Sequence, residues 1–164
     1  MTTHEPLIPQ VLSFSEVIAE PDMSADTHGA PNQPGKDSYV LVVDDDPDAR
    51  EILKLVMRNI RLAVKEAQNG IEALELIRAE RPSLILLDLM MPVMDGFQVL
   101  THLRSDPETR AIPIIVVTGI KEGHETLRLP GVSQVLVKGS FNIPQIRQIV
   151  TEALGMDSVP VVMR

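Results

Sequence analysis

The chain has 164 residues, which is room for one domain of ordinary size, and its 44% apolar and 23% charged content is typical of a folded globular protein. The formal charge of −8, with only one Tyr and three Phe, disfavours nucleic acid and anionic lipid as partners. The absence of cysteine excludes disulfides, thiolate metal sites and cysteine nucleophiles. No apolar run approaches roughly 18 residues, so we expect no membrane insertion and a cytoplasmic location.

The composition of the chain changes near residue 38. Residues 1–37 contain five prolines and six acidic residues against one lysine, which predicts a flexible extension. Apolar residues with helical spacing allow a short helix over 9–19, which would dock on its own domain or bind a partner. We predict one domain over 38–155 and a short C-terminal tail over 156–164.

From residue 39 onward, apolar runs typical of buried strands alternate with segments of helical periodicity. The predicted strands are Tyr39–Val43, Leu62–Ala67, Leu84–Leu87, Ile114–Val117 and Val135–Val137. Helices are predicted over 49–60, 71–77, 97–103, 122–129 and 143–153, the last with Asn142 as its N-cap. Strands that alternate with helices predict an α/β doubly wound fold, with a parallel sheet covered on both faces.

Polar residues follow the predicted strands at the edge where ligands bind in open parallel sheets. Asp44 and Asp45 follow the first strand, Asp88 the third, Thr118 the fourth and Lys138 the fifth. Neighbouring strands lie about 4.8 Å apart, and two carboxylates at about 4 Å repel by roughly 4 kcal/mol. A cation would relieve that repulsion, and oxygen ligands suit Mg²⁺ or Mn²⁺. A carboxylate there can also attack phosphorus and form an aspartyl phosphate.

Each of these residues also has a structural explanation when taken singly. An aspartate at a strand-to-helix junction is often a helix N-cap, and Asp45 or Asp46 would serve this purpose for the helix after Pro47. A threonine after a strand is common. The presence of such polar residues at four strand ends together favours a cation-binding, phosphate-accepting site over these separate structural explanations.

Four segments of the chain resemble the receiver domain of bacterial two-component response regulators. They are Leu41–Pro47, Asp88–Gly96 (Asp-Leu-Met-Met-Pro-Val-Met-Asp-Gly), Val117-Thr118 and Val137-Lys138. The resemblance implies a flavodoxin-like (βα)5 fold with strand order 2-1-3-4-5, and an N-terminal extension before it. It also implies roles: Asp88 matches the phosphoacceptor, and Thr118 and Lys138 match residues that bond the phosphoryl group. The residues that match the family's Mg²⁺ ligands are Asp44, Asp45, Asp88 and the backbone carbonyl of Met90.

The resemblance implies a single-domain response regulator that accepts a phosphoryl group from a sensor histidine kinase or a histidine phosphotransfer protein. It would be a switch rather than an enzyme, acting at most on its own phosphorylation. About ten residues follow Leu154, too few for a helix-turn-helix output, so we expect output through another protein. Met90 and Ile120 match positions that tune phosphate loss in the family, and because both are apolar we expect slow hydrolysis.

Two residues depart from the family pattern. Val135 stands where the family usually has an aromatic residue, and Gly139 replaces the proline after the lysine, so the usual Lys-Pro cis bond is absent. These departures favour an alternative, an adaptor with a receiver fold that works without phosphorylation. A phosphohydrolase with an aspartate nucleophile is disfavoured, because such enzymes usually carry a second aspartate where this chain has Met90.

Overall fold

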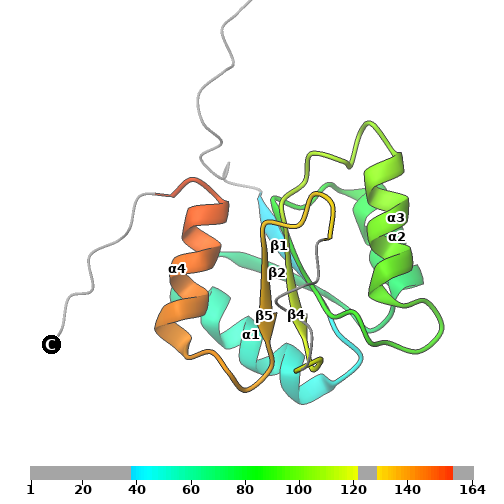
Figure 1. Ribbon diagram of the computed structural model, residues 1–164. Coiled ribbons are helices and arrows are strands. Elements are labelled where there is room, and N and C mark those ends of the chain that lie inside the picture. Colours follow the sequence, from blue (N-terminus) through cyan, green and yellow to red (C-terminus); the bar gives the residue numbers. More distant parts are fainter. Residues whose placement is uncertain (1–37, 122–128, 157–164) are drawn as a thin grey trace, which may run out of the picture. The chain divides into compact units, whose positions relative to one another are not determined.

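A computed structural model describes residues 38–121 and 129–156, and in these ranges a parallel sheet of five strands packs between four helices (Figure 1). The strands are β1 (Tyr39–Val43), β2 (Ala63–Ala67), β3 (Leu84–Leu87), β4 (Ile114–Thr118) and β5 (Gln134–Val137). The helices are α1 (Pro47–Asn59), α2 (Gly70–Ala79), α3 (Gly96–Ser105) and α4 (Ile143–Ala153). The strand order is β2-β1-β3-β4-β5, which confirms the predicted doubly wound fold.

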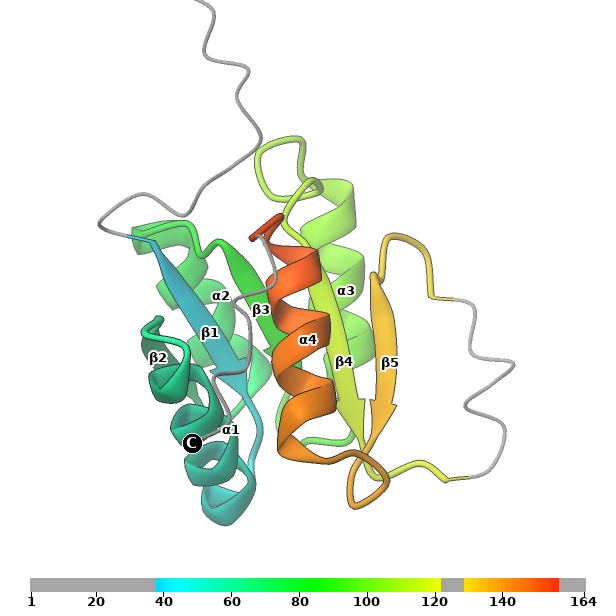
Figure 2. The ribbon, with the colours of Figure 1, turned by 90° about the vertical axis from the view of Figure 1, so that its left-hand side faces the viewer.

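The apolar strands send alternate side chains to the two faces of the sheet. In β1, Leu41 and Val43 pack into the cluster that contains the buried residues of α2 and α3. Val40 and Val42 point the other way, into the cluster that contains those of α1 and α4. Figure 2 shows α1 and α4 together on one face of the sheet. Both faces of the central strands are therefore buried, which explains their continuous apolar runs.

Helix starts follow the capping residues in the sequence. The Asp46 carboxylate accepts a hydrogen bond from the Asp48 amide at 2.9 Å, at the start of α1. The Asn142 side chain accepts one from the Gln145 amide at 2.9 Å, at the start of α4. Both caps confirm predictions from the sequence, and Asp46 rather than Asp45 is the cap of α1.

Four residues that helped to define the helical patterns do not lie in the core. Ile52, Ile71, Phe97 and Ile143 are exposed by 54%, 46%, 38% and 56%. Successive helical residues are about 100° apart, so Ile52 points away from the sheet when its neighbour Leu53 is buried. The periodicity correctly predicted the four helices of the described ranges but made their buried stripes too wide.

Several predicted features fall outside the described residues. They include the extension over 1–37 with its short helix over 9–19, the tail beyond residue 156, and the helix over 122–129 except Leu129. Across the described ranges, no helix has both the length and the apolar character needed to span a membrane.

The buried phenol of Tyr39 predicts a loss of stability at alkaline pH. Burial, with a smaller contribution from the Glu80 charge, raises the pKa of Tyr39 to about 12 from the ordinary value of 10.0. Since the folded-state pKa is the higher one, the phenol stabilises the fold below pH 10, and this contribution is lost as the pH rises towards 12. Between pH 9 and pH 12, the wild type should lose about 2 kcal/mol more unfolding free energy than Tyr39→Phe in urea titrations. Equal losses of unfolding free energy in the two proteins would contradict the assignment of this pH dependence to Tyr39.

Candidate functional site

The polar residues predicted for one sheet edge meet there, because the strands that carry them are neighbours. Asp44 and Asp45 follow β1, Asp88 follows β3, Thr118 ends β4 and Lys138 follows β5. The backbone ladder continues past the strand ends: the Asp88 amide donates to the Val43 carbonyl at 2.9 Å, and the Lys138 amide to the Thr118 carbonyl at 2.8 Å. The sheet therefore fixes the backbone position from which each polar side chain extends.

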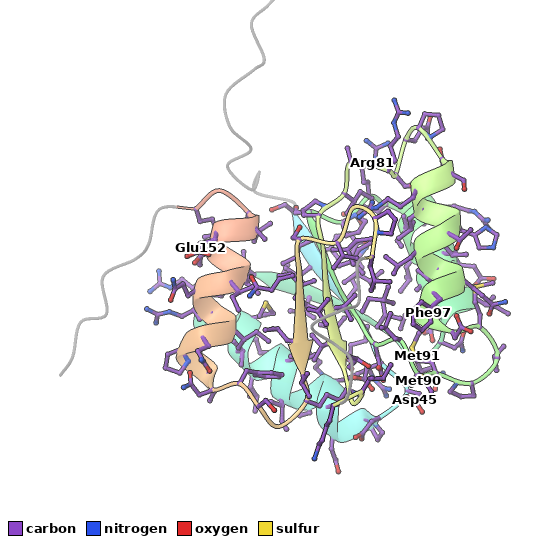
Figure 3. All side chains as sticks on the ribbon, in the orientation of Figure 1. Asp45, Arg81, Met90, Met91, Phe97 and Glu152 are labelled. Carbon is purple, nitrogen blue, oxygen red and sulfur yellow. The ribbon has the colours of Figure 1, made fainter. Side chains whose placement is uncertain are left out.

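Three carboxylates form a cluster at this edge. One carboxylate oxygen each from Asp44, Asp45 and Asp88 lie within 4.8 Å of one another. Asp44 and Asp88 are buried, at 1% and 3% exposure, whereas Asp45 is exposed. Figure 3 shows Asp45 and Met90 at the same end of the sheet. The cluster thus combines a buried pair of acids with an acid that is open to solvent.

The Lys138 ammonium lies between the two buried acids. Its Nζ is 2.6 Å from Asp44 Oδ2 and donates a hydrogen bond to Asp88 Oδ2 at 2.9 Å. Asp44 Oδ2 is buried, and the close contact with Nζ is an ion pair without hydrogen-bond alignment. Three ionised carboxylates and one ammonium leave two negative charges uncompensated. A hard divalent cation such as Mg²⁺ fits this set of oxygen donors and the charge it leaves open.

Burial and ion pairing oppose each other at Asp44 and Lys138. Burial raises the pKa of Asp44, and the close contact with the Lys138 ammonium only partly offsets that effect. Burial lowers the pKa of Lys138, but the close contact with Asp44 and the hydrogen bond and charge of Asp88 outweigh it, so the pKa is raised overall. The lysine is therefore charged at neutral pH, while its charge alone does not compensate the burial of the Asp44 carboxylate.

Short-range hydrogen bonds orient three of the side chains. Asp44 Oδ1 accepts from the Asp46 amide at 2.9 Å, and Asp88 Oδ1 accepts from the Met90 amide at 3.2 Å. The fully buried Thr118 hydroxyl accepts from the Ile120 amide at 3.3 Å. In each case the amide two residues further on holds the side chain, so the loop after each strand shapes the site.

The close packing of the loop after β3 explains why this loop ends in the pair Asp95-Gly96. A Cβ on Gly96 would lie 2.2 Å from the Asp88 carbonyl oxygen, so only glycine lets α3 start this close to the site. Asp95 caps α3 with a hydrogen bond from the Gln98 amide at 2.8 Å. Within this loop Met91 is buried, whereas Met90 is 61% exposed (Figure 3). The backbone of Asp88 is thus packed directly against the start of a capped helix.

The two departures from the family pattern have clear structural roles. Val135 is half-buried and packs against the core on the α2 and α3 face. Gly139 has a φ of +80°, a conformation that glycine adopts without the strain of other residues. All peptide bonds in the described residues are trans, as predicted for a chain that lacks the Lys-Pro pair. A glycine therefore suits the turn that follows Lys138 in this chain.

Sequence reasoning did not single out Arg50, which also contacts the site. Its Nη1 donates to the Asp44 carbonyl oxygen at 2.7 Å, and its Nε lies 3.3 Å from Glu66 Oε1 on β2. An arginine in the first turns of a helix that follows two site acids is a weak signal, because arginines are common on exposed helix faces. The contact becomes visible only when α1, β1 and β2 are placed together.

Comparisons with known proteins agree with this arrangement. A family model described as the response regulator receiver domain matches residues 40–151. An uncharacterised 14.6 kDa protein in the sodA1 3′ region of Leptolyngbya boryana is 36% identical over 112 residues, which are 67% of this chain and 86% of that protein. The transcriptional regulatory protein SrrA of Staphylococcus aureus is 44% identical over 92 residues, which are 56% of this chain but only 36% of SrrA.

Solved structures with the same fold include proteins with a metal bound. The response regulator TrrA of Thermotoga maritima, solved in complex with Mg²⁺-BeF, has 29% identity and a TM-score of 0.63 over 71% of this chain and 98% of TrrA. The receiver domain of the sensor histidine kinase PA1611 of Pseudomonas aeruginosa holds a magnesium ion in its active-site cleft. It has 26% identity and a TM-score of 0.64 over 72% of this chain and 98% of that domain.

Proposed function

Because the chain belongs to the response regulator receiver domain family, we propose that Asp88 accepts a phosphoryl group in a Mg²⁺-dependent reaction and that another protein detects the result. The observation that carries this proposal is the charge arrangement around Asp88. Its buried carboxylate lies with two further carboxylates, and the Lys138 ammonium bridges it to Asp44. A site with these groups has a nucleophile, ligands for a cation and a positive charge for the incoming anion.

In the proposed transfer, an Asp88 carboxylate oxygen forms a bond to phosphorus while the bond from phosphorus to the donor nitrogen breaks. The leaving ring keeps the electron pair of the broken bond, and it departs as neutral imidazole when its other ring nitrogen carries a proton. The product on Asp88 is an acyl phosphate. Lys138 lies 2.9 Å from Asp88 Oδ2, so its ammonium can contact an oxygen of the new phosphoryl group, and the Thr118 hydroxyl is proposed to bond another. Mg²⁺ bound by Asp44, Asp45, Asp88 and the Met90 carbonyl would neutralise charge on the transferred oxygens.

The proposed donor is a sensor histidine kinase or a histidine phosphotransfer protein, and the proposed output is contact with a further protein. Relatives of this fold occur both as response regulators and within histidine kinases, as TrrA and PA1611 illustrate. In this proposal the protein is a switch that acts only on its own phosphorylation. A cytoplasmic location remains a prediction.

The proposal is tested with the full chain and a small phosphodonor such as acetyl phosphate. Intact-mass spectrometry should detect one added phosphoryl group when Mg²⁺ is present and none when EDTA replaces it. Failure to label the wild type with Mg²⁺ present would contradict the proposal and favour the phosphorylation-independent adaptor. Binding of a Mg²⁺-BeF complex under the same buffer conditions is a second test that does not depend on donor choice.

The side chain of Met90 predicts slow loss of the phosphoryl group. It is 61% exposed two residues after Asp88, and a thioether is a poor partner for an attacking water. Met90→Asn should shorten the half-life of the phosphorylated protein severalfold, because an amide can orient water there. Val93→Asn in the same loop, 77% exposed, is the matched control and should leave the half-life unchanged. A wild-type half-life of seconds would show the prediction to be wrong.

A further inference from the structure

Arg50 connects three elements around the acid cluster. From the first turns of α1, its Nη1 donates to the carbonyl oxygen of Asp44 at 2.7 Å. Its Nε lies 3.3 Å from Glu66 on β2, and only 16% of its side chain is exposed. Glu66 in turn lies 2.9 Å from Lys54 Nζ, one helical turn further along α1. The guanidinium is thus held between the end of β1 and the neighbouring strand.

The other polar atoms of Asp44 are also engaged. Its amide donates to the Ala67 carbonyl at 3.1 Å, Oδ1 accepts from the Asp46 amide at 2.9 Å, and Oδ2 lies 2.6 Å from Lys138 Nζ. Arg50 completes this set at the carbonyl oxygen. Charged donors form the stronger hydrogen bonds of proteins, so the guanidinium strongly restrains the peptide that joins Asp44 to Asp45.

We propose that Arg50 is a positioning residue, which fixes this peptide so that the Asp44 and Asp45 carboxylates are held ready for a divalent cation. This inference rests on the proposed function, because the cation is part of it. Charge alone would have the opposite effect, since a positive side chain near the cluster weakens cation binding. Removal of Arg50 should therefore weaken cation binding if Arg50 positions the peptide, and strengthen cation binding if only the charge of Arg50 matters.

Lys54→Met is the matched control for Arg50→Met. Both substitutions remove one positive charge from α1 and one ion pair with Glu66, but only Arg50 contacts Asp44. Mn²⁺ affinity of the full-length variants can be measured from the EPR signal of free Mn²⁺. Residues behind metal ligands typically change affinity by about tenfold or more. We expect Arg50→Met to bind Mn²⁺ about tenfold more weakly than Lys54→Met; equal or tighter binding would overturn the inference.

A second readout needs no metal. In the metal-free protein, the Asp46 amide that donates to Asp44 Oδ1 should exchange with deuterium faster in Arg50→Met than in Lys54→Met. Equal exchange rates would overturn the inference, and so would faster exchange across the whole sheet, which would indicate a general loss of stability. If the wild type bound no Mn²⁺, the proposed function would fail, and the exchange rates would still decide the role of Arg50.

Discussion

Asp88→Asn is expected to abolish phosphoryl transfer to the protein, reducing the label to the level seen without a donor. The amide nitrogen and oxygen that replace the carboxylate are poor nucleophiles, and the change only exchanges one carboxylate oxygen for an NH2 group of nearly the same size. The label should be measured by intact-mass spectrometry after incubation with acetyl phosphate and Mg²⁺. The variant should fold, because it removes one of three clustered carboxylates and leaves the Lys138 contact with Asp44 in place.

Asp95→Asn is the matched control for this experiment. Asp95 is the N-cap of α3 in the same loop, and asparagine caps helices about as well as aspartate does. The Asp95→Asn variant should incorporate as much phosphoryl label as the wild type. Persistent labelling of Asp88→Asn would show that another residue is the phosphoacceptor. Loss of label in both variants would indicate a general defect of the loop.

Lys138→Met is expected to lower the unfolding free energy by about 2–3 kcal/mol at pH 7 without Mg²⁺. The substitution leaves the buried carboxylates of Asp44 and Asp88 without their shared ammonium. Loss of one partner of a fully buried pair costs about 3–5 kcal/mol, and the smaller value reflects the 27% exposure of the lysine side chain. Urea unfolding followed by circular dichroism would measure the difference.

Addition of Mg²⁺ should restore much of the stability that Lys138→Met loses, because a cation that binds the folded cluster neutralises the same two carboxylates. Lys54→Met is again the control: its lysine pairs with Glu51 and Glu66, whose side chains are 52% and 39% exposed. Ion pairs with an exposed partner contribute little to stability, and Mg²⁺ should have no selective effect there. Unchanged stability of Lys138→Met would contradict the bridging role of the ammonium.

The sheet and the residues at its edge could be predicted from the sequence because two simple rules combine. Strands buried on both faces appear as continuous apolar runs, and parallel strands end at one edge. Asp44, Asp88 and Lys138 therefore came together once the runs were identified. Strand β2 gave a weaker signal because it is an edge strand in which only Ala67 is buried.

Other features depended on how elements pack, and the sequence could not supply them. The contact of Arg50 with the Asp44 carbonyl requires the end of β1, the first turns of α1 and the neighbouring strand β2 to be in place. The exposure of Ile52 likewise depends on the rotation of α1 against the sheet. Periodicity gives the face of a helix only to within about a quarter of a turn.

The position of the phosphoryl group on the chain is the measurement that tests the account most directly. After incubation with acetyl phosphate and Mg²⁺, borohydride reduction converts an aspartyl phosphate to homoserine, which tandem mass spectrometry locates by residue. We predict homoserine at position 88 alone, and none when the donor or Mg²⁺ is omitted. Homoserine at another aspartate, or its absence from a folded protein that binds Mg²⁺, would contradict the account.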